Sequence, residues 1–93
     1  MARIQWDPDK NAHLQRERGV SFEEVLVALD TDQVLADIPY PNPQRYPNQR
    51  LLIVNINDYA YEVPYVPTAD GYFLRTIFPS RKATRRYLRK APE

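Results

Sequence analysis

Residues 50–66 read RLLIVNINDYAYEVPYV, and this stretch decides the fold. Two runs of β-branched and aromatic residues lie on either side of Asn57 and Asp58, a pattern that predicts a β-hairpin with these two residues near the turn. Pro64 lies inside the second run and cannot donate a backbone hydrogen bond to a neighbouring strand. The second run is therefore predicted to be an edge strand or to carry a bulge at this proline.

Two helices are predicted before the hairpin. Asp7 can cap a first helix that has Pro8 at its first position and ends near Arg18, before Gly19. In the second, Ser21 and Glu24 have the spacing of a capping box. The residues of this second segment that share an apolar face at helical period are Phe22, Val25, Leu26 and Leu29.

The remaining segments complete one α+β domain over residues 1–93. Residues 3–6 read as a short strand, and residues 39–49, rich in proline, read as an irregular loop. Residues 72–78 read as the last strand, after which a basic helix begins. We therefore expect a short N-terminal strand, two helices, an antiparallel sheet of about four strands and a C-terminal basic helix, with the helices packed against one face of the sheet.

The net charge of +1 conceals a strong asymmetry along the chain. The first 70 residues carry eleven of the twelve acidic and six of the thirteen basic residues, whereas the last 23 have a net charge of +6. A local positive patch attracts phosphate groups whatever the total charge of the protein. Nucleic acid or an acidic protein is therefore the leading class of partner.

The C-terminal helix places its cations on two neighbouring faces. Arg81, Arg85 and Arg89 share one face, and Lys82, Arg86 and Lys90 share the next; Thr84, Tyr87, Leu88 and Ala91, of which Ala91 lies outside the residues that the structure describes, form a narrow stripe that can pack. Cations suit the negative end of a helix but not its positive end. The position of Arg81 and Lys82 at the positive end therefore favours binding of a ligand over a merely solvated face.

Three features of the strands are ambiguous from sequence. Arg75 interrupts an apolar strand between Phe73 and Ile77, so its guanidinium either enters a site or reaches solvent at an edge. Glu62 shares a strand face with apolar residues, and it is an edge residue, an ion-pair partner for a strand arginine or a general base. The tyrosines of residues 59–65 share the other face and are more typical of a core than of a base-stacking platform. His13 is interpreted as a surface or packing residue rather than a catalytic one.

Several enzyme classes are not supported by the residues. With one histidine, no cysteine and two glycines, the sequence offers no zinc-ligand set and no glycine-rich phosphate loop. RNA cleavage by the substrate's own 2′-hydroxyl needs cations and proton-transfer groups but no metal and no cofactor, and it fits the residues present. Since the sequence has no cysteine and no long apolar segment, we expect a cytoplasmic protein that does not associate with a membrane.

Two motifs resemble the BrnT family of bacterial toxins. The first is WDPDKNAHLQRERGVSFEEV at residues 6–25, and the second is RTIFPSRKATRRY at residues 75–87. The resemblance implies a RelE-like fold and a ribonuclease that acts without the ribosome and inhibits growth. It also implies neutralisation by a BrnA-like antitoxin with a ribbon–helix–helix part, through which the complex would bind operator DNA.

The leading hypothesis is thus a toxin-type ribonuclease that is independent of metal ions. The residues expected to be catalytic are Arg75, Arg81 and Glu62, and those expected to bind RNA are Lys82, Arg85, Arg86 and Arg89. By the resemblance, Arg75 corresponds to an arginine in the family's last strand, and Arg81 to the one that follows the serine. Two alternatives use the same cations without catalysis: a nucleic-acid-binding module, and a subunit that docks an acidic protein partner.

Overall fold

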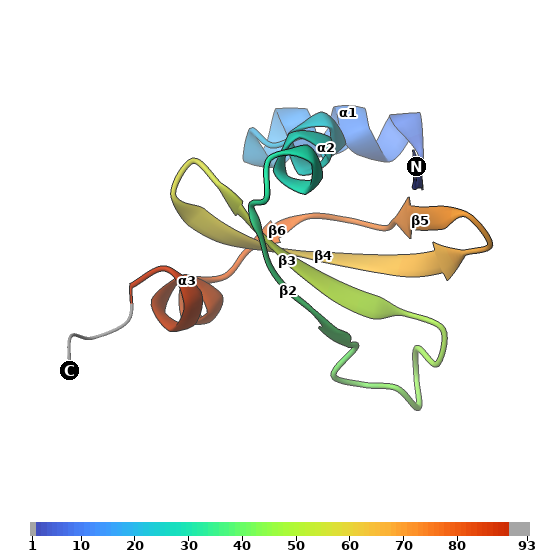
Figure 1. The fold of residues 1–93 in the computed structure, drawn as a ribbon. Coiled ribbons are helices and arrows are strands. Elements are labelled where there is room, and N and C mark those ends of the chain that lie inside the picture. The colour runs from blue at the N-terminus through green and yellow to red at the C-terminus, as the bar shows by residue number, and fades with distance from the viewer. Residues whose placement is uncertain (1, 90–93) are drawn as a thin grey trace.

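The computed structural model describes residues 2–89 as three helices and a mixed sheet (Figure 1). The elements in chain order are β1 (Arg3–Gln5), α1 (Pro8–Arg18), α2 (Phe22–Asp30), β2 (Val34–Pro39), β3 (Arg50–Ile56), β4 (Tyr59–Thr68), β5 (Gly71–Leu74), β6 (Phe78–Pro79) and α3 (Arg81–Tyr87). The strand order is β1-β5-β4-β3-β2, and β6 pairs with β4. The predicted α+β class is confirmed.

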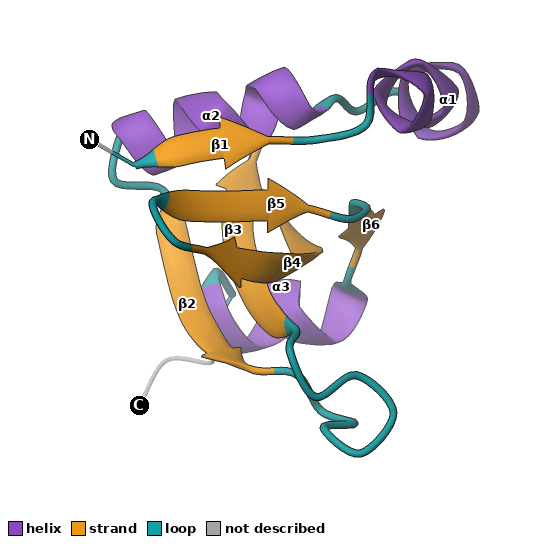
Figure 2. Ribbon diagram, turned by 90° about the vertical axis from the view of Figure 1, so that its right-hand side faces the viewer, coloured by secondary structure: helices purple, strands orange, loops and turns teal. Residues whose placement is uncertain are grey.

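The sheet is mixed, so the prediction of an antiparallel sheet of about four strands was wrong. β1 pairs with β5 in parallel, with Arg3 opposite Gly71 (Figure 2). A Cβ atom at Gly71 would lie only 1.9 Å from the carbonyl oxygen of Arg3, so the glycine permits the close approach of the two backbones. The partner of β1 lies more than 65 residues away in the sequence, and no local pattern indicates such a pairing.

Both N-terminal helices begin where they were predicted to begin, and α1 also ends at the predicted residue. The Asp7 side chain accepts a hydrogen bond from the backbone N–H of Asp9 at 2.9 Å, and Gly19 ends α1 in the left-handed region with φ 68°. The Glu24 carboxylate accepts a hydrogen bond from the backbone N–H of Ser21 at 3.0 Å, as expected for a capping box. Local hydrogen bonds therefore account for both helix starts.

Asn11 connects α1 to the first turn of α2. Its side-chain oxygen accepts from the backbone N–H of Phe22 at 2.8 Å, and its side-chain nitrogen donates to the Glu23 carboxylate at 2.7 Å. The second contact lowers the pKa of Glu23 below its usual value. The ring of Phe22 stacks on Trp6 at a centroid distance of 5.6 Å. The motif at residues 6–25 therefore contains the contacts that join α1 to α2 and that pack Trp6, the residue after β1, on α2.

The sheet has a core on each face, so the prediction that the helices cover one face was wrong. α1 and α2 pack on one face, in the helix-side core, which contains Leu14, Phe22, Val25, Leu52, Val54, Val63, Leu74 and Ile77. α3 packs on the opposite face, in the α3-side core, which contains Leu51, Ile53, Ala60 and Ala83. Figure 1 shows α3 on the side of the sheet away from α1 and α2. Residues 51–54 are all buried, and such a run needs cover on both faces.

Pro64 lies opposite a break in the neighbouring strand. β4 is an internal strand, so the edge alternative is wrong, but the expected irregularity is present: Tyr65 pairs with Leu74, and Glu62 pairs with Phe78. Three residues, 75–77, therefore face two residues of β4, which is a bulge. The Pro64 carbonyl accepts from the backbone N–H of Arg75 at 2.8 Å, but proline has no N–H to donate in return.

The predicted last strand is consequently divided into β5 and β6. The backbone carbonyl of Ile77, in the break, accepts a hydrogen bond from the guanidinium of Arg18 at 2.7 Å. Both Leu74 and Ile77 are buried in the helix-side core, although they are three residues apart. Simple alternation along one strand therefore fails here, and Phe73, Arg75 and Ile77 do not form the continuous strand face that we expected.

Candidate functional site

α3 is attached to the sheet by its small and hydroxyl-bearing residues. The Ser80 side chain accepts from the backbone N–H of Ala83 at 3.0 Å, and the Ser80 backbone N–H donates to the carbonyl of Ala60 at 3.0 Å. The Thr84 hydroxyl accepts from the backbone N–H of Ala60 at 2.8 Å and donates to the carbonyl of Ser80 at 2.7 Å. Ala83 and Thr84 are both buried. The burial of Thr84 agrees with its place in the predicted packing stripe.

The cations of α3 take no part in these attachments. Arg81, Lys82, Arg85 and Arg86 are exposed, and within residues 2–89 none of them forms an ion pair. Arg86 lies 5.7 Å from the ring centre of Tyr87, its neighbour in the chain. The fold therefore uses the uncharged face of α3 and leaves four cations in solvent, where they repel one another mildly. Cations arranged in this way are suited to bind several phosphate groups.

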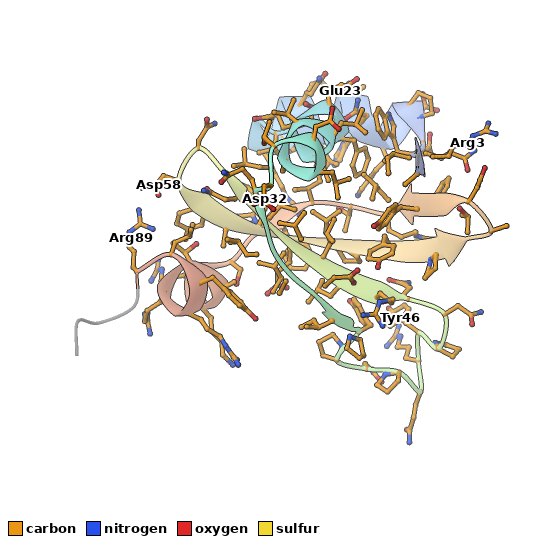
Figure 3. All side chains as sticks on the ribbon, in the orientation of Figure 1. Arg3, Glu23, Asp32, Tyr46, Asp58 and Arg89 are labelled. Carbon is orange, nitrogen blue, oxygen red and sulfur yellow. The ribbon has the colours of Figure 1, made fainter. Side chains whose placement is uncertain are left out.

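Arg89 differs from the other predicted RNA-binding residues. α3 ends at Tyr87, so Arg89 lies beyond the helix, and Lys90 lies outside the described residues. The Arg89 guanidinium donates to the Asp58 carboxylate at 3.3 Å and to the Asp58 carbonyl at 3.2 Å. Figure 3 shows the two side chains facing each other at the hairpin end of the sheet. Such an exposed ion pair contributes about 0–1 kcal/mol and leaves Arg89 available to a ligand.

A shallow hollow lies between α3 and β4, with a volume of about 440 Å³. We call it the α3 hollow; it is lined by Tyr59, Arg81, Thr84, Arg85 and Arg89. The structure thus brings three predicted residues together, but Tyr59 was not predicted as part of a site. Its position depends on the packing of α3 against β4, for which the sequence gives no local signal.

Glu62 lies in a different hollow, of about 310 Å³, which we call the loop hollow. It is lined by Tyr40, Pro41, Asn42, Arg45, Tyr46, Leu51 and Glu62. The half-buried Glu62 is paired with Ile53 on one side and Phe78 on the other, so it forms part of the floor on the α3 side of the sheet. The predicted catalytic residues Glu62 and Arg81 therefore lie on the same sheet face but in separate hollows.

Aromatic rings and a cation form the wall of the loop hollow. The rings of Tyr40 and Tyr46 meet edge to face, with centroids 5.2 Å apart, and the Arg45 guanidinium lies 5.6 Å from the ring centre of Tyr46. From sequence, residues 39–49 were predicted only to be an irregular loop. Tyr40, Arg45 and Tyr46 nevertheless place two aromatic rings and a cation within seven positions of the sequence. From this pattern a binding surface on the loop could have been predicted.

Arg75 is exposed, and its backbone lies opposite Pro64, two residues along β4 from Glu62. Arg75 lies in the break between β5 and β6, where the regular alternation of side chains fails, so its neighbours in the chain do not determine its face. Its exposure is compatible with both alternatives for the guanidinium, entry into a site and contact with solvent at an edge.

The ends of the loop are held by a cluster of three polar side chains. The Tyr65 hydroxyl donates to the Asp37 carboxylate, with distances of 2.8 and 2.9 Å to its two oxygens. The Arg50 guanidinium donates to the same carboxylate at 3.1 Å. Because β2 ends at Pro39 and β3 begins at Arg50, this cluster fixes both ends of the loop that carries Arg45. Burial, together with the hydrogen bond to Asp37, raises the pKa of Tyr65 to about 12.

Alkaline pH should weaken the fold through Tyr65. The pKa of Tyr65 is higher in the folded state than the unfolded value of about 10, so its stabilising effect is complete below pH 10 and is lost as the pH rises through about 12. The ionisation of Tyr65 should lower the free energy of unfolding by about 2 kcal/mol over this pH range. Urea unfolding of the wild type and Tyr65→Phe between about pH 9 and pH 12 measures it. If the free energy of unfolding fell equally steeply with pH in the two proteins, Tyr65 would not be the group responsible for the loss.

Other parts of the molecule offer less chemistry. Another hollow, of about 520 Å³, is also lined by loop residues, but Arg50, which lines it, is already bound to Asp37. In residues 2–89, no three His, Cys, Asp or Glu side chains gather where they could hold a metal ion, and His13 is exposed. None of the described helices is long and apolar enough to span a membrane. Comparisons with protein-family models, curated proteins and solved structures found no match for the chain.

Proposed function

We propose that this protein is a toxin-type ribonuclease that binds RNA on the α3 side of its sheet and cleaves it without a metal ion. The observation that carries the proposal is that the uncharged residues of α3 attach it to β4, whereas its exposed cations form no ion pair within the described chain. The backbone of the exposed Arg75 lies opposite Pro64, two residues along β4 from Glu62. The resemblance to BrnT toxins supports the same function.

The proposed chemistry is transesterification by the substrate. The Glu62 carboxylate accepts the proton of the RNA 2′-hydroxyl, whose oxygen attacks the adjacent phosphorus. The negative charge that develops on the phosphorane is stabilised by guanidinium groups, for which Arg75 and Arg45 are available near Glu62. The P–O bond to the 5′-oxygen breaks, and water protonates the leaving oxygen. The products are a 2′,3′-cyclic phosphate and a 5′-hydroxyl.

In this proposal Arg81 binds RNA and does not touch the reacting atoms. Arg81 lines the α3 hollow together with Arg85, whereas Glu62 lines the loop hollow. Tyr59 and Glu62 are three residues apart in β4, which corresponds to about 10 Å along a strand. The cations of α3 therefore hold phosphates that flank the cleaved one. A cognate BrnA-like antitoxin with an acidic segment would neutralise the toxin by covering α3, and operator DNA would bind only to its ribbon–helix–helix part.

A second candidate function is binding of nucleic acid without cleavage. The observation that favours it is that the α3 hollow and the loop hollow share no residue. A phosphate held only by Arg81 and Arg85 would then be remote from the carboxylate of Glu62. Under this alternative the protein binds RNA with the same salt dependence but leaves it intact.

The role of α3 can be tested through the salt dependence of RNA binding. Each phosphate contact to single-stranded nucleic acid contributes about 0.7 to the slope of log affinity against log salt. The double variant Arg81→Ala with Arg85→Ala should therefore bind a short RNA more weakly, with a slope that is smaller by about 1.4. Arg3→Ala with Arg16→Ala removes the same charge elsewhere and should keep the wild-type slope. Equal slopes for both double variants would refute an RNA site on α3.

Expression in bacteria tests the toxin part of the proposal. Induction of the wild type should stop growth, and total RNA from the same culture should be degraded. Arg81→Ala with Arg85→Ala should allow growth because the RNA is no longer held. Normal growth and intact RNA after induction of soluble, folded wild-type protein would favour the candidate that binds without cleavage.

A further inference from the structure

We propose that the loop hollow binds one unstacked base of single-stranded RNA, which makes single-stranded RNA the substrate class of this protein. The inference rests on the proposed function and adds a second site to it: α3 holds phosphates, and the loop holds a base. Its basis is the composition of the hollow, the fixed ends of the loop and its position beside Glu62.

The composition of the loop hollow fits a nucleobase. Its volume of about 310 Å³ is at the lower end of the range of about 300–1,000 Å³ for small-molecule sites. Tyr40 and Tyr46 are half-buried and meet edge to face, and the guanidinium of Arg45 lies over the ring of Tyr46. Aromatic rings and arginine planes are the groups on which proteins stack single-stranded bases. Asn42 adds an amide that can bond to the edge of a base.

The loop is held in shape before any ligand binds. The cluster of Asp37, Arg50 and Tyr65 fixes both of its ends, as described above. Within the loop, the backbone N–H of Tyr46 donates to the carbonyl of Asn42 at 3.0 Å. The prolines of the segment, Pro41, Pro43 and Pro47, further restrict its conformations. A preformed wall of this kind lowers the entropic cost of ordering the loop around a base.

The position of the hollow relates it to the phosphate-binding helix. Figure 1 shows α3 and the loop at two ends of the same side of the sheet, and Figure 3 places Tyr46 in the loop, far from Arg89. A single strand that crosses this side meets cations at both ends, from α3 and from Arg45, which is exposed. The bases of a duplex are stacked and paired, so they cannot enter the hollow without being flipped out.

Binding of modified oligonucleotides tests the inference without interference from cleavage. The probe is a set of short single-stranded oligonucleotides with 2′-O-methyl riboses, each lacking the base at one position. Loss of a stacked base lowers affinity by about 5- to 150-fold. The wild type should show such a loss at one or two neighbouring positions. Tyr46→Ala should bind the intact probe more weakly by a similar factor and should be insensitive to removal of that base.

Three comparisons make the outcome decisive. Tyr46→Phe keeps the ring and should retain the wild-type profile, as should Gln44→Ala, which alters the loop away from the hollow. A flat profile in the wild type, or an unchanged affinity of Tyr46→Ala, would overturn the base site. If the Arg81 and Arg85 double variant still weakened binding in that case, the phosphate site on α3 would stand and only the base site would fail. No binding of any probe by the wild type would refute both.

Discussion

Replacing Glu62 by glutamine should lower the rate of RNA cleavage by about 10²- to 10⁴-fold and leave RNA affinity nearly unchanged. Glutamine has the size of glutamate but cannot accept the 2′-proton. Glu62 is half-buried at the floor of the loop hollow, and neither a hydrogen bond nor an ion pair holds its side chain in the described residues, so the substitution should not weaken the fold. Single-turnover cleavage and equilibrium binding, measured on the same RNA, separate the two effects.

The control for this prediction is Glu17→Gln, which removes an exposed carboxylate from α1. It should cleave RNA at the wild-type rate. If Glu62→Gln also did so, Glu62 would not be the proton acceptor. If Glu62→Gln instead lost affinity and cleavage by the same factor, Glu62 would be a binding residue of the loop hollow.

Phe22→Ala should lower the free energy of unfolding by about 3–5 kcal/mol. Phe22 is fully buried in the helix-side core, stacks on Trp6 and donates its backbone N–H to Asn11. Typical domains have a stability of only about 5–15 kcal/mol, so this variant should be close to unfolding at body temperature. Denaturant unfolding measures this loss as a lower midpoint, with an unchanged dependence of the free energy of unfolding on denaturant concentration.

Val27→Ala is the matched control, because Val27 is in the same helix but 60% exposed. It should change the free energy of unfolding by less than about 0.5 kcal/mol. A loss for Phe22→Ala as small as that of Val27→Ala would contradict the description of the helix-side core.

The residues that carry the resemblance to BrnT toxins have mostly structural roles here. Asp7 caps α1, Asn11 joins α1 to α2, and Ser80 and Thr84 attach α3 to β4. Residues with such contacts indicate how the chain folds. The case for RNA binding therefore depends on the exposed cations between them, such as Arg81 and Arg85, which no contact of the described fold explains.

Local signals in the sequence predicted the elements that depend on local contacts. The first two helices begin where the capping residues indicated, and the first ends where Gly19 indicated. The hairpin turn is at Asn57 and Asp58, which both have positive φ, of 54° and 64°, as a two-residue turn of this kind requires. These features are determined by hydrogen bonds and backbone preferences within a few residues.

Contacts between distant segments could not be predicted in the same way. The parallel pairing of β1 with β5 and the bulge opposite Pro64 depend on how the whole sheet assembles. The bulge explains why Arg75 does not continue a strand, and the packing of α3 explains why Tyr59 lines the α3 hollow. The loop hollow was missed because its wall and its floor, Tyr46 and Glu62, come from segments that no sequence pattern joins.

The most direct test of the account is incubation of the purified wild-type protein with a short single-stranded RNA in the presence of a metal chelator. A second RNA of the same sequence carries a single 2′-deoxyribose at the cleavage position. We predict that the first RNA is cleaved to a fragment with a 2′,3′-cyclic phosphate and that the second stays intact at this position. If the RNA were bound but never cleaved, the proposed ribonuclease activity would be refuted, and the alternative of a protein that only binds nucleic acid would remain.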